Sequence, residues 1–79
     1  PGPVTVEKEL EEKELAGAID RWLRGRSKED RILFLRRYWY GVELQELAAE
    51  RGMSPNRLAQ KMHRLRRSLK QALAKEGYL

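Results

Sequence analysis

Apolar residues along this chain recur at intervals of three and four positions, in four stretches separated by glycines. In the first stretch, residues 6 to 24, the apolar positions on one face are Leu15, Ala18, Ile19, Trp22 and Leu23. This spacing predicts an amphipathic helix. Five glutamates occupy its first turns, where the positive end of the helix dipole favours negative charge: Glu7, Glu9, Glu11, Glu12 and Glu14.

A second helix is predicted from the capping residue Ser27 to about Tyr40. We expect Gly25 to end the first helix in a left-handed conformation, and Ser27 followed by Asp30 resembles a capping box with Asp in place of Glu or Gln. The apolar residues of this helix point in most directions, so it should be buried on more than one side. They are Ile32, Leu33, Phe34, Leu35, Tyr38, Trp39 and Tyr40, and Gly41 follows them.

The last two predicted helices are a short one from Leu44 to Arg51 and a long one that begins at Pro55. Ser54 suits the cap of the long helix, and Pro55 suits its first position, where no N–H is needed. The inward residues of the short helix are Leu44, Leu47 and Ala48, and those of the long helix are Leu58, Met62, Leu65, Leu69, Ala72 and Leu73. The opposite face of the long helix carries Asn56, Gln60, His63, Arg64 and Arg67.

Together these elements predict an all-α, compact four-helix domain over residues 6–79, with no strand and no wing. Residues 1 to 5 are expected to be a linker or an expression scar. The last two helices have the layout of a helix-turn-helix. Ala48 would let the helices approach, Gly52 would take a positive φ, Met53 would fill the space beneath the turn, and Leu58 would anchor the second helix. A plain αα-hairpin would explain Ala48 and Gly52 equally well.

Charge favours the helix-turn-helix interpretation. The net charge is +5, yet residues 1 to 50 carry nine basic and eleven acidic residues. Between Arg51 and Lys75 there are eight basic residues and no acid: Arg51, Arg57, Lys61, Arg64, Arg66, Arg67, Lys70 and Lys75. Such clustering on a helix is typical of nucleic-acid binders, because each cation that meets a phosphate releases a condensed counterion. A plain hairpin does not explain this acid-free face.

Other classes of function are disfavoured by composition. There is no cysteine, which fits a reducing cytoplasm, and no apolar run reaches the roughly 20 residues of a membrane span. His63 is the only histidine, and nothing near it or the early glutamates provides a nucleophile or a glycine-rich phosphate loop. We therefore expect a cytoplasmic protein that is not an enzyme, with no metal, cofactor or small-molecule substrate and no membrane contact.

Over residues 29 to 73 the chain resembles a known family. The segments that carry the resemblance are SKEDRILFLRRYWYG at 27 to 41, ELAAERGMS at 46 to 54, and a ladder of Leu, Met, His and Arg from Leu58 to Leu69. They are similar to the C-terminal region-four domain of bacterial RNA polymerase sigma factors, particularly the compact alternative ones. The resemblance implies recognition of the minus-35 promoter element in duplex DNA, with another face holding the flap of the polymerase β subunit.

The resemblance also implies roles for particular residues. The base-reading positions fall on Pro55, Asn56, Arg57 and Gln60. Amides such as Asn56 and Gln60 can pair with adenine, and Arg57 suits guanine or a phosphate. Pro55 departs from the family pattern, as does Glu43, which stands where a Ser or Thr cap is commoner. The positions assigned to phosphates are Lys61, Arg64, Arg66 and Arg67.

The aromatic residues admit two interpretations. Helical spacing favours packing in the core for Trp22, Phe34, Tyr38, Trp39 and Tyr40, over a stacking platform for single strands. Because four short helices cannot cover every side of the second one, an exposed patch should remain there for the β flap or an anti-sigma protein. Its residues are expected among Leu33, Phe34, Leu35 and Tyr38. Two rival functions stay open: a stand-alone helix-turn-helix regulator, and a basic helical module that binds an acidic protein.

Overall fold

The computed structural model describes residues 6–79, and over that range it contains four helices and no strand. The elements are α1 (Val6–Arg24), α2 (Lys28–Phe34) with a π-helical continuation η1 (Leu35–Trp39), α3 (Leu44–Glu50) and α4 (Pro55–Lys75). The predicted all-α architecture is confirmed. The expected linker at residues 1 to 5 lies outside the described residues.

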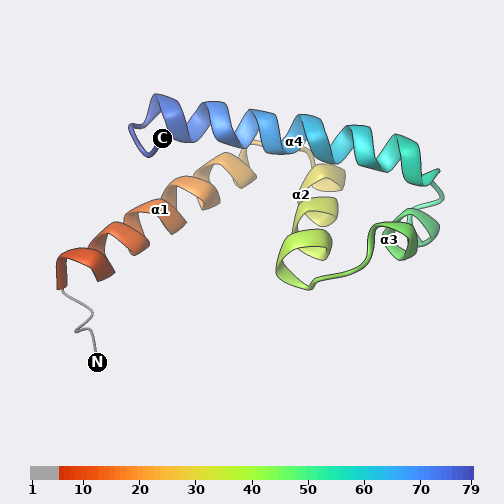
Figure 1. Cartoon of the computed structure of the whole chain (residues 1–79), viewed down its shortest axis with the longest axis horizontal. Helices are drawn as coiled ribbons and strands as arrows, with labels where there is room; N and C mark the ends of the chain where they lie inside the picture. Colours follow the sequence, from red (N-terminus) through yellow and green to blue (C-terminus); the bar gives the residue numbers. More distant parts are fainter. Residues whose placement is uncertain (1–5) are drawn as a thin grey trace.

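Helix α4 runs along the longest dimension of the molecule, which measures 44 × 30 × 18 Å, and α1, α2 and α3 lie below it in Figure 1. The core forms where α2, α3 and α4 meet, and Trp22 joins it from α1. The largest fully buried side chains are Leu33, Leu47, Leu58 and Met62. The inward faces predicted for α3 and for the first half of α4 are therefore confirmed.

Local chemistry sets the ends of these helices as the sequence predicts at four positions. The hydroxyl of Ser27 accepts a hydrogen bond from the Asp30 N–H at 3.1 Å, and that of Ser54 accepts one from the Arg57 N–H at 3.2 Å. Each bond satisfies an N–H that the first turn of a helix leaves unpaired. Gly41 and Gly52 have φ angles of +68° and +64°, a region that costs most L residues about 1–2 kcal/mol.

The prediction for Gly25 is wrong. The glycines with positive φ among the described residues are Gly41, Gly52 and Gly77. Instead, the Gly25 N–H bonds to the Trp22 carbonyl at 3.1 Å and the Arg26 N–H bonds to the Leu23 carbonyl at 3.0 Å. These tight bonds between residues three apart close the last turn of α1, so no left-handed residue is needed.

The aromatic residues divide between the core and the surface. Trp22 is 7% exposed and packs edge-on against Phe34, with ring centroids 5.1 Å apart. Trp39 and Tyr40 are 79% and 66% exposed, so the prediction of core packing is wrong for these two, whereas Tyr38, at 43%, is exposed as the alternative prediction of a surface patch allowed. Trp39 and Tyr40 lie at the end of the α2–η1 helix that is farther from α4 (Figure 1), whereas the Tyr38 hydroxyl meets Arg66 of α4.

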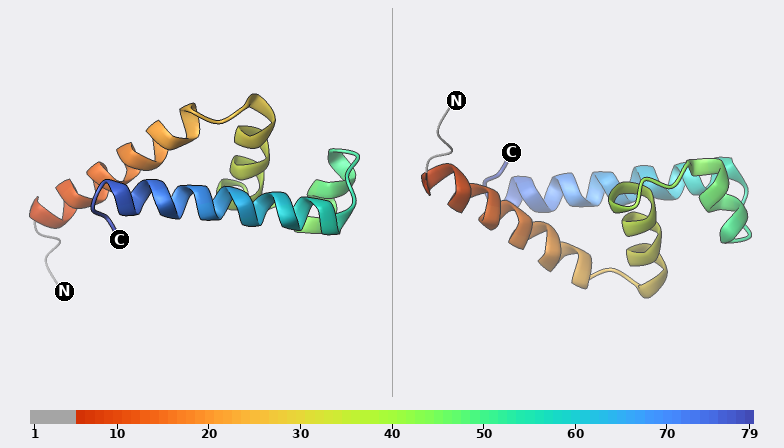
Figure 2. Two further views of the ribbon diagram at one scale, coloured as in Figure 1. Left: turned by 90° about the horizontal axis from the view of Figure 1, so that it is seen from above. Right: turned by 90° about the horizontal axis from the view of Figure 1, so that it is seen from below.

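Helix α1 contacts the rest of the molecule mainly through its C-terminal half. The Trp22 Nε1–H donates to the Ser68 hydroxyl at 3.0 Å, and Arg21 pairs with Glu76 at 2.7 Å. The two views of Figure 2, from above and from below, project the start of α1 beside the C-terminal end of α4, but Figure 1 shows that these two ends lie apart. Leu15 was expected on the inner face but is 36% exposed, because α1 and α4 diverge in this direction (Figure 1).

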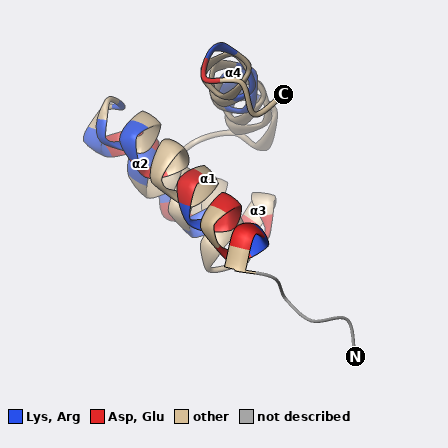
Figure 3. Cartoon of the chain, turned by 90° about the vertical axis from the view of Figure 1, so that its left-hand side faces the viewer, with Lys and Arg blue, Asp and Glu red and all other residues tan. Residues whose placement is uncertain are grey.

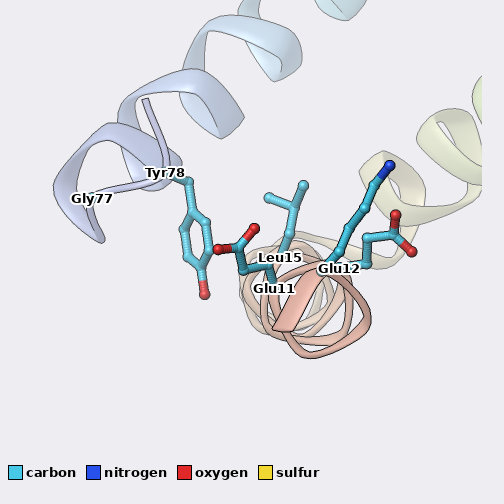
Figure 4. A pocket seen from close by; sticks show the side chains of 6 residues that line it. Glu11, Glu12, Leu15, Gly77 and Tyr78 are labelled. Atoms are coloured by element: carbon cyan, nitrogen blue, oxygen red, sulfur yellow. The ribbon is translucent and has the colours of Figure 1, made fainter. Parts of the chain in front are cut away.

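A hollow remains between the first half of α1 and the C-terminal turn of the chain. It is lined by Lys8, Glu11, Glu12, Leu15, Gly77 and Tyr78. Figure 4 shows the Tyr78 side chain reaching from the turn toward α1, beside Glu11. Since this lining contains two glutamates and one lysine, the hollow is unsuited to a polyanion.

Candidate nucleic-acid interface

The first two turns of α4 present the residues predicted to read bases. Pro55, Asn56, Arg57 and Gln60 are all exposed. Leu58, which is fully buried, fixes how the helix is turned. At about 100° per residue, Asn56 and Gln60 lie about 160° and 200° around the helix from Leu58. Both amides are thus placed on the side of α4 opposite the core, where a ligand can reach their donors and acceptors.

The residues predicted to meet phosphates occupy three sides of α4. Arg64 and Arg67 are exposed near the outward face. Arg66 lies on one flank, where its guanidinium donates to the Tyr38 hydroxyl at 2.6 Å. Lys61 lies on the other flank, half-buried, with its Nζ 3.3 Å from Asp30 Oδ1. A helix in a major groove has a backbone strand on either side, so cations on both flanks are compatible with that geometry.

Acids from α2 neutralise part of the basic segment. Arg51 pairs with Glu29, and the hydrogen bond from Arg51 to Glu29, aided by the attraction of the two charges, raises the pKa of Arg51 above its ordinary value. Lys61 on α4 likewise pairs with Asp30 on α2. The other six basic residues of the segment form no ion pair within residues 6–79, namely Arg57, Arg64, Arg66, Arg67, Lys70 and Lys75.

The charges of the molecule are therefore separated between helices. In Figure 3 the acidic residues cluster on α1, whereas α4 carries mainly basic ones. Glu43 occupies the cap position of α3 and makes no side-chain capping bond. The outward face of α4 remains free of carboxylates.

Sequence reasoning missed Arg26, which follows the end of α1. Its side chain is half-buried, and its Nε–H donates to the Trp22 carbonyl at 3.3 Å. The guanidinium also lies over the Trp22 ring, with its central carbon 5.4 Å from the ring centroid. Arg26 lies between two helices and belongs to neither apolar pattern. The only signal of its position in the sequence is the neighbouring cap residue, Ser27, at the start of α2.

The exposure predicted for the partner patch is found, in part or in full, for three of its four residues, and their role in binding a partner stays a prediction. Leu33 is fully buried against α3 and α4, so its assignment to a partner surface is wrong. The other three predicted residues, Phe34, Leu35 and Tyr38, line a groove of about 350 Å³ between α1 and η1. The remaining lining residues are Ala16, Ile19, Asp20, Leu23 and Trp39. The groove is therefore apolar apart from Asp20 and the Tyr38 hydroxyl.

Features of other kinds of site are sparse in the described part of the chain. Residues 6–79 contain no group of three or more His, Cys, Asp or Glu side chains placed to hold a metal ion. No helix in that range combines the length and the apolar character needed to cross a membrane. His63 is exposed on the outward face of α4, next to Gln60 and Arg64.

No protein-family model, curated protein or solved structure matches the chain. The resemblance to sigma region four stays a prediction from the motifs between residues 27 and 69.

Proposed function

We propose that this chain binds duplex promoter DNA through the outward face of α4, in the manner of the region-four domain of a sigma factor. The observation that carries the proposal is the division of α4 into two faces. Leu58 and Met62 hold one face in the core at 0% and 1% exposure. The opposite face exposes amide and guanidinium groups with no carboxylate among them.

In this proposal the N-terminal half of α4 lies in the major groove. Asn56 and Gln60 form paired hydrogen bonds with adenine edges, and Arg57 contacts guanine or a phosphate. Pro55 lacks an N–H and contributes packing, for example against a thymine methyl. Arg64, Arg66 and Arg67 contact phosphates, which set the register of the protein on the duplex without reading sequence. Lys61 also contacts a phosphate, through the N–H donors that its ion pair with Asp30 leaves over.

The sigma-factor form of the proposal also needs a polymerase contact. The groove between α1 and η1 is the surface that we assign to the flap of the polymerase β subunit, or to an anti-sigma protein. Phe34, Leu35 and Tyr38 line it, and Leu35 is 37% exposed. An apolar groove of this kind suits a helix that presents an apolar face. The protein would then act in the cytoplasm, where promoters are transcribed.

A titration of random and selected duplexes across a range of salt concentrations tests DNA binding. If about five phosphates are neutralised, log K should fall with log salt with a slope near −4.5. Selection of bound sequences from a random duplex pool should enrich one short site. A chain that binds no duplex even in dilute buffer would leave only the protein-interaction module, in which the same basic face holds an acidic protein.

A separate experiment distinguishes a sigma domain from a stand-alone regulator. Immobilised β-flap peptide should retain the wild-type chain and lose the Leu35→Asp variant, because the new charge lies in the groove. Leu33 is unsuitable for this test, since a charge in the core would unfold the domain. A chain that binds its DNA site but ignores the flap peptide is a regulator that acts without polymerase contact. The matched control is Leu10→Asp, on the exposed first half of α1.

A further inference from the structure

A second polar site lies beside the face that we assign to bases. A cleft of about 250 Å³ separates the junction of α1 and α2 from the middle of α4. Its lining residues are Arg26, Asp30, Lys61, Arg64, Leu65 and Ser68. Three cations face one carboxylate there, so the cleft carries an excess of positive charge.

Arg26 is the residue that makes this cleft more than a surface depression. Its guanidinium is held in place by the Trp22 carbonyl at 3.3 Å, by the Ser68 hydroxyl at 3.4 Å and by the Trp22 ring. No carboxylate of residues 6–79 lies within 4 Å of it. A guanidinium that is half removed from water without a counter-ion gains most from an anion, and its planar fork matches two oxygens of a phosphate.

The other charges of the cleft leave room for such an anion. Asp30 forms an ion pair with Lys61, whose Nζ lies 3.3 Å from Asp30 Oδ1, and this buried oxygen accepts no hydrogen bond. An ammonium has three N–H donors, so one ion pair does not exhaust Lys61. Arg64 is exposed and also lines the neighbouring surface with Gln60 and His63. It therefore connects the cleft with the outward face of α4.

We propose that Arg26, Lys61 and Arg64 together hold one backbone phosphate of the duplex that lies along α4. This inference rests on the proposed function, and it adds a contact from outside the helix-turn-helix. A phosphate diester of bound DNA fits better than a free anion, because Arg64 makes the cleft continuous with the outward face. A contact from the α1–α2 junction fixes the angle of α4 in the groove, since phosphate contacts set orientation.

Two glutamine substitutions test the proposal. Arg26→Gln should weaken binding to every duplex about tenfold and reduce the salt slope by about 0.9, the value for one phosphate. The control is Arg24→Gln, which removes one positive charge two residues from Arg26. Arg24 is exposed and pairs with Asp20 at 2.9 Å. It should change affinity less than threefold. Equal effects of the two substitutions would overturn the proposal in favour of general charge attraction.

A scan of the DNA backbone locates the contact. Neutral methylphosphonates are introduced one at a time into the preferred duplex. At one or two positions, a neutral phosphate should weaken binding by the wild-type chain and by Arg24→Gln but not by Arg26→Gln, which has already lost that contact. At all other positions the neutral phosphate should affect the three proteins alike. Loss of affinity by Arg26→Gln at every position, including those one or two, would contradict a local contact.

Two further measurements deal with an unstable variant and with a free anion as the ligand. Thermal unfolding followed by circular dichroism shows whether each variant is folded. If Arg26→Gln is unstable, Arg26→Lys serves in its place: it keeps the charge but removes the planar fork, so it should lose part of the affinity. Titration with inorganic phosphate tests a free anion as ligand: saturation below millimolar concentration, without an effect of Arg26→Gln on DNA binding, overturns the proposal. A wild-type chain that binds no duplex overturns the proposed function as well.

Discussion

The guanidinium of Arg66 on α4 donates a hydrogen bond to the hydroxyl of Tyr38 on η1 at 2.6 Å. Tyr38 also lines the apolar groove and packs against Phe34, with ring centroids 5.0 Å apart. One flank of the proposed DNA-binding helix therefore touches the rim of the proposed partner surface.

This contact allows the effect of the charge of Arg66 on DNA binding to be separated from the effect of its hydrogen bond to Tyr38. We expect Arg66→Gln to reduce the salt slope of duplex binding by about 0.9 and to weaken all sequences alike, because one phosphate contact is lost. Tyr38→Phe keeps the ring and the charge of Arg66, so the slope should be unchanged. Measuring affinity at four salt concentrations decides the matter. A slope that falls in Tyr38→Phe as well would mean that the hydroxyl itself positions Arg66 on the DNA.

Gln60 and Arg64 should differ in the kind of affinity they supply. Gln60→Ala should cost about 1–3 kcal/mol on the preferred duplex and leave random duplex unaffected, because a base contact is removed. Arg64→Ala should weaken both duplexes equally. Competition titrations with the two duplexes give the ratio. Equal losses on both duplexes for Gln60→Ala would remove it from the base-reading set.

Substitution by alanine should destabilise the protein at Gly52 and leave its stability almost unchanged at Gly25. At Gly52, with φ of +64°, a Cβ meets no atom within 4 Å, so the loss of stability should be the backbone strain alone, about 1–2 kcal/mol. At Gly25 the φ is not left-handed and a Cβ would meet the Trp22 carbonyl oxygen at 3.4 Å, an ordinary contact. Gly25→Ala should therefore change stability by less than about 0.5 kcal/mol. Urea unfolding of both variants compares them, and a larger loss for Gly25→Ala would reverse the assignment of the two turns.

The two tryptophans should differ in their effect on stability. Trp22 is 7% exposed, so Trp22→Ala should lower the free energy of unfolding by about 3–5 kcal/mol. Trp39 is 79% exposed, and Trp39→Ala should change it by less than about 0.5 kcal/mol. Thermal or urea unfolding measures both. A loss above about 2 kcal/mol for Trp39→Ala would show that it is packed in solution, against the rest of η1 or a second copy.

Features set by local chemistry could be predicted from the sequence. Ser54 and Pro55 place the start of α4, Gly52 places the turn, and the spacing of Leu58 and Met62 fixes which face is buried. Each follows from a few neighbouring residues, as does the exposure of Asn56 and Gln60. The DNA-binding role of this face stays a prediction.

Features that depend on how distant segments meet could not be predicted. The apolar residues of α2 surround the helix, so their pattern does not reveal that Leu33 faces α3 and α4 whereas Leu35 faces outward. The π turn, in which the Tyr40 N–H bonds to the Leu35 carbonyl at 3.0 Å, has no simple sequence signal. The pairing of Lys61 with Asp30, 31 positions apart in the sequence, also depends on the docking of α2 against α4.

The exposure of positions 56, 57, 60 and 63, with none contributing to the core, makes this helix a scaffold for retargeting. A library randomised at these four codons would keep Leu58, Met62 and the capping hydroxyl of Ser54 untouched. Almost every member should fold, so selection would sort the clones by what they recognise.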